Sequence, residues 1–404
     1  MRYLILKITC ISLLFAGISA NMDLLADSDV TFSTNFESGA AADLKVRQDG
    51  SIEFSIPPDP GGDQYLWFYF QVISKKKEPH RFILKNATGA HQTGKRWNIT
   101  KPIFSADGEK WVRAQKVQYA RQVSISDMSI AKVFRFQSPI IAETLYVAYS
   151  YPYTNTDLRD YLGTICIDQS VEITKFGSTE EERPIPLLQI DSPREKKIWI
   201  IGREHPGETP LSFVCEGMIQ ALLDSPAGWK LRQSYGFSIV PILNVDGVEN
   251  GYYYHNTGGV NLARDWEEFS SQEVQSLHSA MLHDIENGRL KLIVNLHSSN
   301  DPSKGHFFLR IPENKLSADN ALLQKRIFEV AGNYHPQIQG RSPVTLYDLP
   351  GITGNALNEK YGVYCLYLES NYSRGADGTI PDPQSWHAVG EALVKALAEV
   401  LLSE

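Results

Sequence analysis

The stretch KIWIIGREHPGETP, residues 197–210, decides the fold of the second half of this chain. Its first part, Lys197–Gly202, is largely apolar and predicts a buried strand, and Pro210–Leu223 predicts a helix that follows it. A strand that leads directly into a helix is the repeating unit of an α/β domain. In such domains ligands bind in the crevice outside the carboxyl ends of the strands. The polar residues 203–209 occupy that position.

The same alternation continues to the end of the chain. Strands are predicted at 237–243, 290–296, 307–310 and 363–368, and helices at 271–286 and 386–402, the last capped by Ser385. We therefore expect residues 155–404 to form an α/β domain with a mostly parallel, mixed sheet flanked by helices.

The first half has a different rhythm. Ser51–Ile56 alternates between polar and apolar residues, and Tyr65–Phe70 and Leu145–Ser150 are rich in aromatic residues. Turn-forming segments rich in Pro, Gly, Asn and Asp separate these runs. Many short strands with such punctuation predict an all-β sandwich, here over residues 25–150. A chain of 404 residues is also long enough for two domains.

The first twenty residues predict a signal peptide. Arg2 and Lys7 are followed by the apolar run Ile8–Phe15 and by the small residues 17–20, which is the order of a secretory signal. Cleavage after Ala20 is expected. A retained anchor is the less favoured alternative, because the apolar run is too short to span a bilayer comfortably. The protein is then exported, to the periplasm or outside the cell, without stable membrane insertion after cleavage. The net charge of −8 argues against a nucleic-acid partner.

His205 and Glu208 are candidate metal ligands. They are three residues apart, so a tight loop can aim both side chains at one point, and imidazole and carboxylate groups suit Zn²⁺. Alone, the pair fits equally well a loop histidine beside a helix-capping glutamate.

Two further polar residues stand at the ends of predicted strands. His297 follows residues 290–296, and Glu369 follows residues 363–368. Residues at the ends of neighbouring strands converge on one crevice, so His297 completes a three-ligand zinc site with a position open for water. Glu369 can accept a proton from that water while the metal polarises a carbonyl. The alternative is that these are unrelated residues at strand ends.

These motifs resemble those of the M14-type zinc carboxypeptidases, and most closely the cytosolic carboxypeptidase subfamily. The similarity covers almost the whole chain that remains after the predicted signal peptide. It rests on the segments REHPGET (203–209), NVDGV (244–248), NLARDW (261–266) and, in the β-sandwich, residues 35–39, 67–70 and 151–154. The resemblance implies that His205, Glu208 and His297 bind one zinc ion per chain. It also implies that Glu369 promotes attack by water and protonates the leaving amine.

The sequence departs from the family at the substrate-binding positions. Tyr254, followed by His255, stands where the family has an arginine that polarises the scissile carbonyl. Ala263 replaces an asparagine that helps to bind the terminal carboxylate of the substrate, and Arg264 of that pair remains. Tyr254 or His255 can donate a hydrogen bond to the developing oxyanion, or the tyrosines can form an aromatic wall.

The sequence therefore predicts a zinc-dependent peptide hydrolase of the metallocarboxypeptidase type, with a peptide or amide as substrate. A zinc deacylase or an amidase acting on cell-wall peptides is the alternative that the lost Arg and Asn favour. A third hypothesis is a module that binds a peptide or glycan and is catalytically weak.

Overall fold

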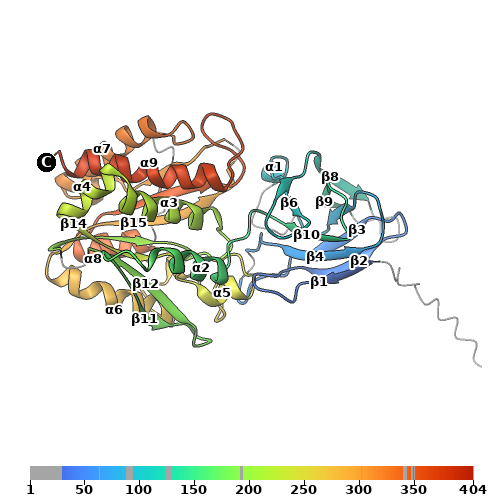
Figure 1. Ribbon diagram of the computed structural model, residues 1–404, viewed down its shortest axis with the longest axis horizontal. Helices are drawn as coiled ribbons and strands as arrows, with labels where there is room; N and C mark the ends of the chain where they lie inside the picture. Colours follow the sequence, from blue (N-terminus) through green and yellow to red (C-terminus); the bar gives the residue numbers. More distant parts are fainter. Residues whose placement is uncertain are drawn as a thin grey trace, which may run out of the picture.

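The computed structural model describes residues 30–403 except 63, 88–93, 124–129, 192–193, 302, 340–343, 347–348 and 350. The predicted signal peptide, residues 1–20, lies outside the described residues. The described chain forms two lobes, a β-rich one and a larger α/β one (Figure 1). The predicted fold class is confirmed in both.

The N-terminal lobe consists of two five-stranded sheets with the orders β1-β4-β10-β6-β7 and β2-β3-β5-β9-β8. Their strands are β1 (Val30–Ser33), β2 (Ala42–Val46), β3 (Ile52–Ser55), β4 (Tyr69–Ser74), β5 (Arg81–Leu84), β6 (Ile103–Ser105), β7 (Val112–Arg113), β8 (Val117–Val123), β9 (Ile130–Gln137) and β10 (Thr144–Ala148), with the short helix α1 (Gly94–Trp97) between β5 and β6. Aromatic side chains fill the core between the sheets, among them Phe54, Phe68, Phe82 and Phe136.

One predicted strand of this lobe is wrong in its limits. The aromatic run Tyr65–Phe70 is not one strand, because β4 begins only at Tyr69. Leu66, Trp67 and Phe68 are buried ahead of the strand. The Trp67 indole N–H donates to the carbonyl of Ser38 (2.8 Å), outside the strand ladder. A buried segment that precedes a strand has the same apolar residues as the strand itself, so the sequence alone does not show where the strand begins.

The second lobe contains an eight-stranded mixed sheet of order β11-β12-β14-β13-β15-β18-β16-β17. Its strands are β11 (Val171–Ser178), β12 (Pro184–Ile190), β13 (Lys196–Ile201), β14 (Tyr235–Val240), β15 (Leu290–Ser299), β16 (Phe307–Arg310), β17 (Val344–Thr345) and β18 (Cys365–Asn371). The central strands β14, β13, β15 and β18 are mutually parallel, and β12 and β16 pair with them antiparallel. The parallel centre places the carboxyl ends of β13, β15 and β18 at one edge.

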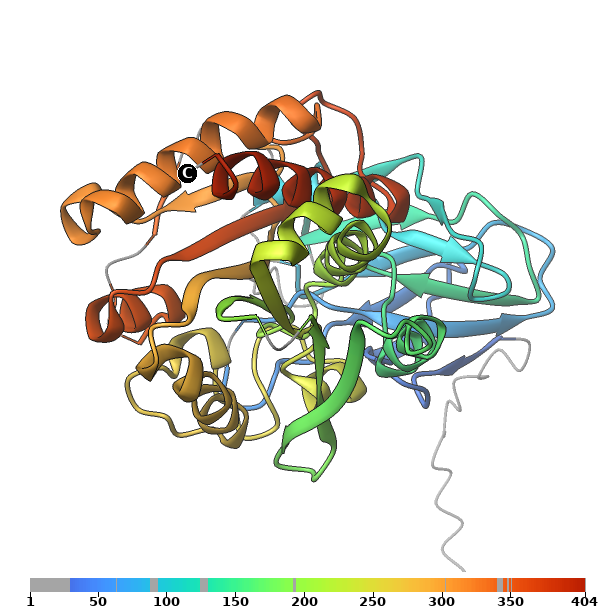
Figure 2. The ribbon, with the colours of Figure 1, turned by 60° about the vertical axis from the view of Figure 1, so that its left-hand side comes forward.

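Helices cover both faces of this sheet. One face carries α3 (Pro210–Asp224), α4 (Pro226–Ser234), α7 (Ala318–Tyr334) and α9 (Pro383–Leu401), and α6 (Gln272–Glu286) and α8 (Thr353–Tyr361) lie on the other face (Figures 1 and 2). Helix α2 (Asn155–Ile165) and the short α5 (Val245–Glu249) lie toward the N-terminal lobe (Figure 1). Helices α3 and α9 cross closely at Gly217 and Gly390. A Cβ on either glycine would lie 2.0–2.1 Å from a carbonyl oxygen of the other helix.

The cap of the last helix differs from the prediction. Helix α9 begins at Pro383, and Asp382 is its N-cap, since the Asp382 carboxylate accepts from the Ser385 backbone N–H (2.8 Å). Ser385 is the reciprocal partner, at position N3, in this capping box and is not the N-cap residue. Asp and Ser are both favoured at the N-cap position, so the sequence alone does not decide whether Asp382 or Ser385 caps the helix.

The two lobes share one packed boundary. Tyr253 and Tyr372 of the second lobe belong to the aromatic core of the first. The Asn300 side-chain amide donates to the hydroxyl oxygens of Tyr149 (2.6 Å) and Thr100 (3.0 Å) in the N-terminal lobe. Among the described residues, the helices are too short or too polar for a membrane crossing.

Candidate active site

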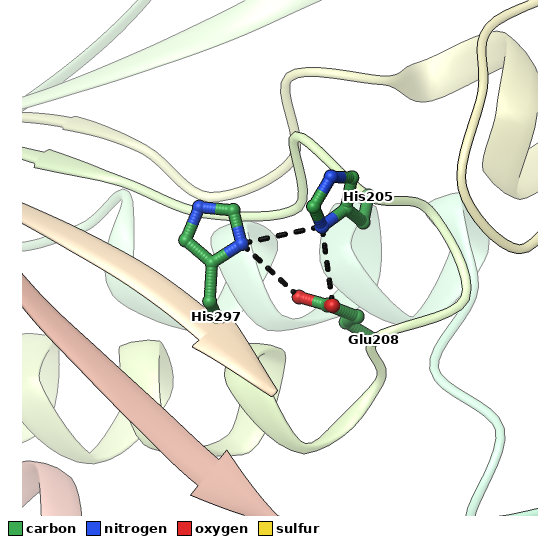
Figure 3. Close-up of side chains that lie close together, drawn as sticks. All are labelled: His205, Glu208 and His297. Carbon is green, nitrogen blue, oxygen red and sulfur yellow. Dashed lines mark hydrogen bonds and ion pairs between the residues drawn. The ribbon is translucent and has the colours of Figure 1, made fainter. Parts of the chain in front are cut away.

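His205, Glu208 and His297 form a compact cluster of metal-ligand atoms (Figure 3). The His205 Nδ1 lies 3.1 Å from Glu208 Oε1 and 3.2 Å from His297 Nδ1, which in turn lies 3.4 Å from Glu208 Oε2. For zinc–ligand distances of about 2.0–2.2 Å, the edges of a tetrahedral site are about 3.3–3.6 Å. The three residues are at most 5% exposed. Their donor types and spacing fit a zinc ion with an open fourth position.

The sheet brings the cluster together. Strand β13 ends at Ile201, whose partner on β15 is Asn295, so the loop after β13 reaches His297 two residues farther along β15. His297 and Glu369 are direct partners across the parallel pair β15–β18. Both residues therefore lie within strands that are longer than predicted, since β15 and β18 pair through Ser299 and Asn371.

Glu204 orients the His297 imidazole from the side opposite the metal position. Its carboxylate is fully buried and lies 3.1 Å from His297 Nε2. It also accepts from the Asn295 amide (2.8 Å), the Thr353 hydroxyl (2.9 Å) and the Trp266 indole N–H (3.2 Å). A carboxylate at Nε2 fixes the tautomer that presents Nδ1 to a metal and makes the ligand more basic.

The other two ligands are held in the same way. His205 Nε2 lies 3.1 Å from the Asn261 side-chain oxygen, and Glu208 Oε2 accepts from the Ser298 backbone N–H (2.9 Å). Glu204 and Asn261 were missed as functional residues in the sequence. The signal was present, because Glu204 adjoins His205 and Asn261 opens the NLARDW segment.

The ionisable groups of the cluster shift one another's pKa values. Burial alone raises the pKa of Glu208, but the imidazoles of His205 and His297 lower it to about 2. Burial lowers the pKa of His297, yet its bonds to Glu204 and Glu208 hold that pKa well above its usual value. A metal binds only an imidazole nitrogen that carries no proton, so metal affinity falls as the solution is acidified.

Glu369 stands beside the ligands with a different electrostatic character. Its carboxylate is partly buried, and burial raises its pKa to about 7, against the opposing charge of His297. The Glu208 carboxylate adds to the increase, and Lys304 and Arg96 reduce it. A carboxylate poised near neutral pH is suited to accept and return a proton.

A cleft of about 650 Å³ opens next to the ligand cluster. Tyr254, His255, Asn261 and Arg264 line it from the second lobe, and Gly61, Gly62 and Gln64 line it from the first. The Tyr254 ring stacks on the His205 imidazole with centroids 3.8 Å apart and an angle of 14°. The structure thus brings each predicted substrate-binding residue to a cleft that adjoins the candidate metal centre.

The residues in and beside the cleft differ in their exposure and in the polar groups that they offer to a substrate. Arg264 is exposed, and its guanidinium carbon lies 6.0 Å from the centre of the Tyr254 ring. Ala263 is 7% exposed and offers no polar side chain. Burial raises the pKa of Tyr254, so its phenol remains a hydrogen-bond donor at neutral pH.

Comparisons with known proteins agree with this architecture. Residues 32–149 match the family model described as the cytosolic carboxypeptidase N-terminal domain, and residues 165–302 match the model described as zinc carboxypeptidase. The chain belongs to the zinc carboxypeptidase family. The match to the zinc carboxypeptidase model includes all three candidate zinc ligands. It ends before Glu369.

Two relatives illustrate the extent of the similarity. Cytosolic carboxypeptidase 6 of Mus musculus is 31% identical over 312 residues, which cover 71% of this chain and 56% of that protein. An uncharacterized protein of Zymomonas mobilis is 26% identical over 375 residues, covering 88% of this chain and 93% of that one. The carboxypeptidase-family chain thus spans little more than half the length of the mouse relative.

The two-lobed arrangement also occurs in a solved structure. A metallo-carboxypeptidase from Burkholderia cenocepacia superposes with a TM-score of 0.80 at 22% identity, covering 93% of this chain and 99% of that chain. Both lobes therefore have the fold of a known metallo-carboxypeptidase.

Proposed function

We propose that this chain hydrolyses peptide bonds, or closely related amide bonds, at a zinc centre formed by His205, Glu208 and His297. One observation carries the proposal: three side chains bring their ligand atoms within 3.1–3.4 Å of one another, with both carboxylate oxygens of Glu208 taking part, directly beside a carboxylate, Glu369, whose strand position pairs with His297. A zinc ion bound there supplies Lewis-acid polarisation of a carbonyl and lowers the pKa of water.

Glu369 is the proton carrier in this proposal. Its carboxylate accepts a proton from water and returns it to the leaving amine. A pKa near 7 supports both transfers, because neither protonation state is strongly favoured at neutral pH. Glu204 and Asn261 keep the imidazoles of His297 and His205 in the ligand orientation throughout.

Tyr254 and Arg264 bind the substrate. The Tyr254 phenol lies in the cleft beside His205, where it donates a hydrogen bond to the oxygen of the scissile carbonyl as charge develops. Arg264 is exposed at the same cleft and contacts a carboxylate of the substrate. His255 forms part of the wall of the cleft.

A second candidate keeps the chemistry and changes the substrate. Ala263 has no side-chain amide to bind a carboxylate together with Arg264, which favours substrates whose terminal carboxylate is not the main anchor. A deacylase, or an amidase acting on cell-wall peptides, has this property. The catalytically weak binding module is disfavoured, since the ligands and Glu369 are all present.

The deciding experiment compares a library of peptides with free and with amidated carboxyl termini. A carboxypeptidase cleaves the free peptides and releases single residues from their ends. Equal cleavage of both forms contradicts exopeptidase action and supports the second candidate. Absence of cleavage by zinc-loaded protein contradicts both.

Export is a separate part of the proposal and rests on residues 1–20, with their charged, apolar and small-residue order. N-terminal sequencing of protein recovered from the extracellular or periplasmic fraction tests it. We expect a chain that begins after Ala20. An intact amino terminus in the cytoplasmic fraction contradicts export.

A further inference from the structure

The boundary between the lobes contains a buried carboxylate that the proposed chemistry does not use. Asp59 belongs to the N-terminal lobe and is 6% exposed. Its Oδ1 accepts from the Tyr253 backbone N–H (2.9 Å), and its Oδ2 accepts from the backbone N–H groups of Tyr254 (2.5 Å) and His255 (3.1 Å). Three consecutive amides of one lobe thus converge on one carboxylate of the other.

The opposite side of the same segment is attached to the metal-binding loop. The Tyr253 carbonyl accepts from the Gly207 backbone N–H (3.0 Å), and the Tyr254 ring stacks on His205. The segment 253–255 is therefore fixed between Asp59 on one side and the loop 205–208 on the other. Its three backbone N–H groups all donate to the same side chain, so one residue of the N-terminal lobe fixes three consecutive positions of the segment.

Two glycines that follow Asp59 in the chain pack closely against the segment 253–255 and the loop after it. A Cβ on Gly62 would lie 2.2 Å from Cε1 of the His255 ring, and a Cβ on Gly61 would lie 3.1 Å from the Gly259 Cα. Gly61 and Gly62 also line the cleft, together with Arg264. The glycines thus allow the two walls of the cleft to approach each other.

We propose that Asp59 is a positioning residue of the active site: the N-terminal lobe uses it to hold Tyr254 and His255 in place beside the metal ligands. This inference rests on the proposed function, because it assigns Asp59 its role through Tyr254. The catalytic lobe alone then lacks one wall of its substrate cleft and the anchor of its carbonyl-binding tyrosine. A misplacement of about 1 Å in such a group is enough for a loss of about 100-fold in rate.

The test uses the full chain with Asp59→Asn, which keeps the shape of the side chain and removes one acceptor oxygen. Asp107→Asn is the matched control, since Asp107 also accepts two backbone N–H bonds, from Glu109 (2.9 Å) and Lys110 (2.8 Å), in an exposed turn of the same lobe. We expect kcat to fall at least tenfold in Asp59→Asn and less than twofold in Asp107→Asn. Zinc content should be equal in both.

A double-mutant cycle separates positioning from a general structural role. If Asp59 acts through the Tyr254 phenol, Asp59→Asn costs little more once Tyr254→Phe is already present. Multiplied losses in the double variant contradict the inference. So does Asp59→Asn activity within twofold of the wild type, or a loss that follows loss of zinc.

A second variant covers the case in which Asp59→Asn does not fold. Gly62→Ala adds a methyl group against His255 and should lower kcat/KM with zinc retained, whereas full activity contradicts the inference. The two proposals fail in different ways. A wild-type chain without zinc and without activity removes the proposed function, and an active wild type with an equally active Asp59→Asn variant removes only the role of Asp59.

Discussion

The two sides of the active site are built differently. On the metal side, His205, Glu208 and His297 are almost fully buried, and each has a second hydrogen-bond partner that fixes its orientation. On the substrate side, Arg264 is exposed, and Tyr254 is held by contacts that cross between two lobes.

This difference separates the residues that carry out the reaction from those that select the substrate. The metal side depends on one sheet and on the loop after β13, so its geometry follows from the α/β domain. The substrate side depends on how two lobes fit together and on a few side chains in a cleft. Substitution on the metal side should abolish the reaction, and substitution on the substrate side should change its rate or its preference.

The largest effect is expected at Glu369. Glu369→Gln removes the proton acceptor and keeps the size of the side chain, so kcat should fall by roughly 10²- to 10⁴-fold. Zinc content should not change, because Glu369 is not among the ligands. Steady-state kinetics with parallel metal analysis measure both, and activity above a tenth of the wild type contradicts the role of Glu369.

The next effect is expected at Tyr254. Tyr254→Phe keeps the stack on His205 and removes the phenol, and a lost oxyanion donor costs on the order of 10²-fold in kcat. Tyr252→Phe, two positions away, serves as the control. If the two variants have the same kcat as the wild type, Tyr254 is an aromatic wall and not a donor.

Glu204→Gln should weaken zinc binding by about 10- to 100-fold, because the His297 imidazole loses its orienting carboxylate. Competition with a chelator measures the affinity. Glu53→Gln, which removes another buried carboxylate in the N-terminal lobe, should leave zinc affinity unchanged even if it lowers stability. Equal affinity in Glu204→Gln and the wild type contradicts an orienting role.

The pH dependence follows from Glu369. A general base is active when deprotonated, so kcat/KM should rise with pH through the pKa of Glu369 and fall about tenfold per unit below it. That pKa is about 7 without a metal, and a nearby zinc ion lowers it, so the acid limb should lie at or below pH 7. In Glu369→Gln the residual kcat/KM should no longer fall at low pH in this way. If the fall is unchanged, a group other than Glu369 causes it.

The smallest effect is expected at Arg264. Arg264→Ala should raise KM by about 3- to 10-fold for peptides with a free carboxyl terminus, because an exposed charged contact is partly screened by solvent. Amidated peptides should be unaffected. An equal rise for both substrates shows that Arg264 does not bind the terminal carboxylate.

Much of the metal side could be predicted from sequence. Apolar runs that lead directly into His297 and Glu369, and the short spacing of His205 and Glu208, predict that these residues meet at one edge of a parallel sheet, as they do in the structure. The partners Glu204 and Asn261 were not assigned, because a carboxylate or amide next to a ligand has many other uses.

The substrate side could be predicted only in part. Tyr254, His255 and Arg264 were named, yet nothing local indicates that Asp59, almost 200 residues earlier, binds the backbone of the same segment. Contacts between lobes depend on the whole fold. The same limit explains the start of β4 at Tyr69, since burial and strand pairing leave similar apolar patterns.

The most direct test of the central claim is the metal content of the full chain, measured after purification and zinc loading, together with that of His297→Ala. The account predicts about one zinc per wild-type chain and a large loss in the variant, with cleavage of a peptide library only by the wild type. A folded wild-type chain that binds no zinc, or that keeps its zinc in His297→Ala, would contradict it.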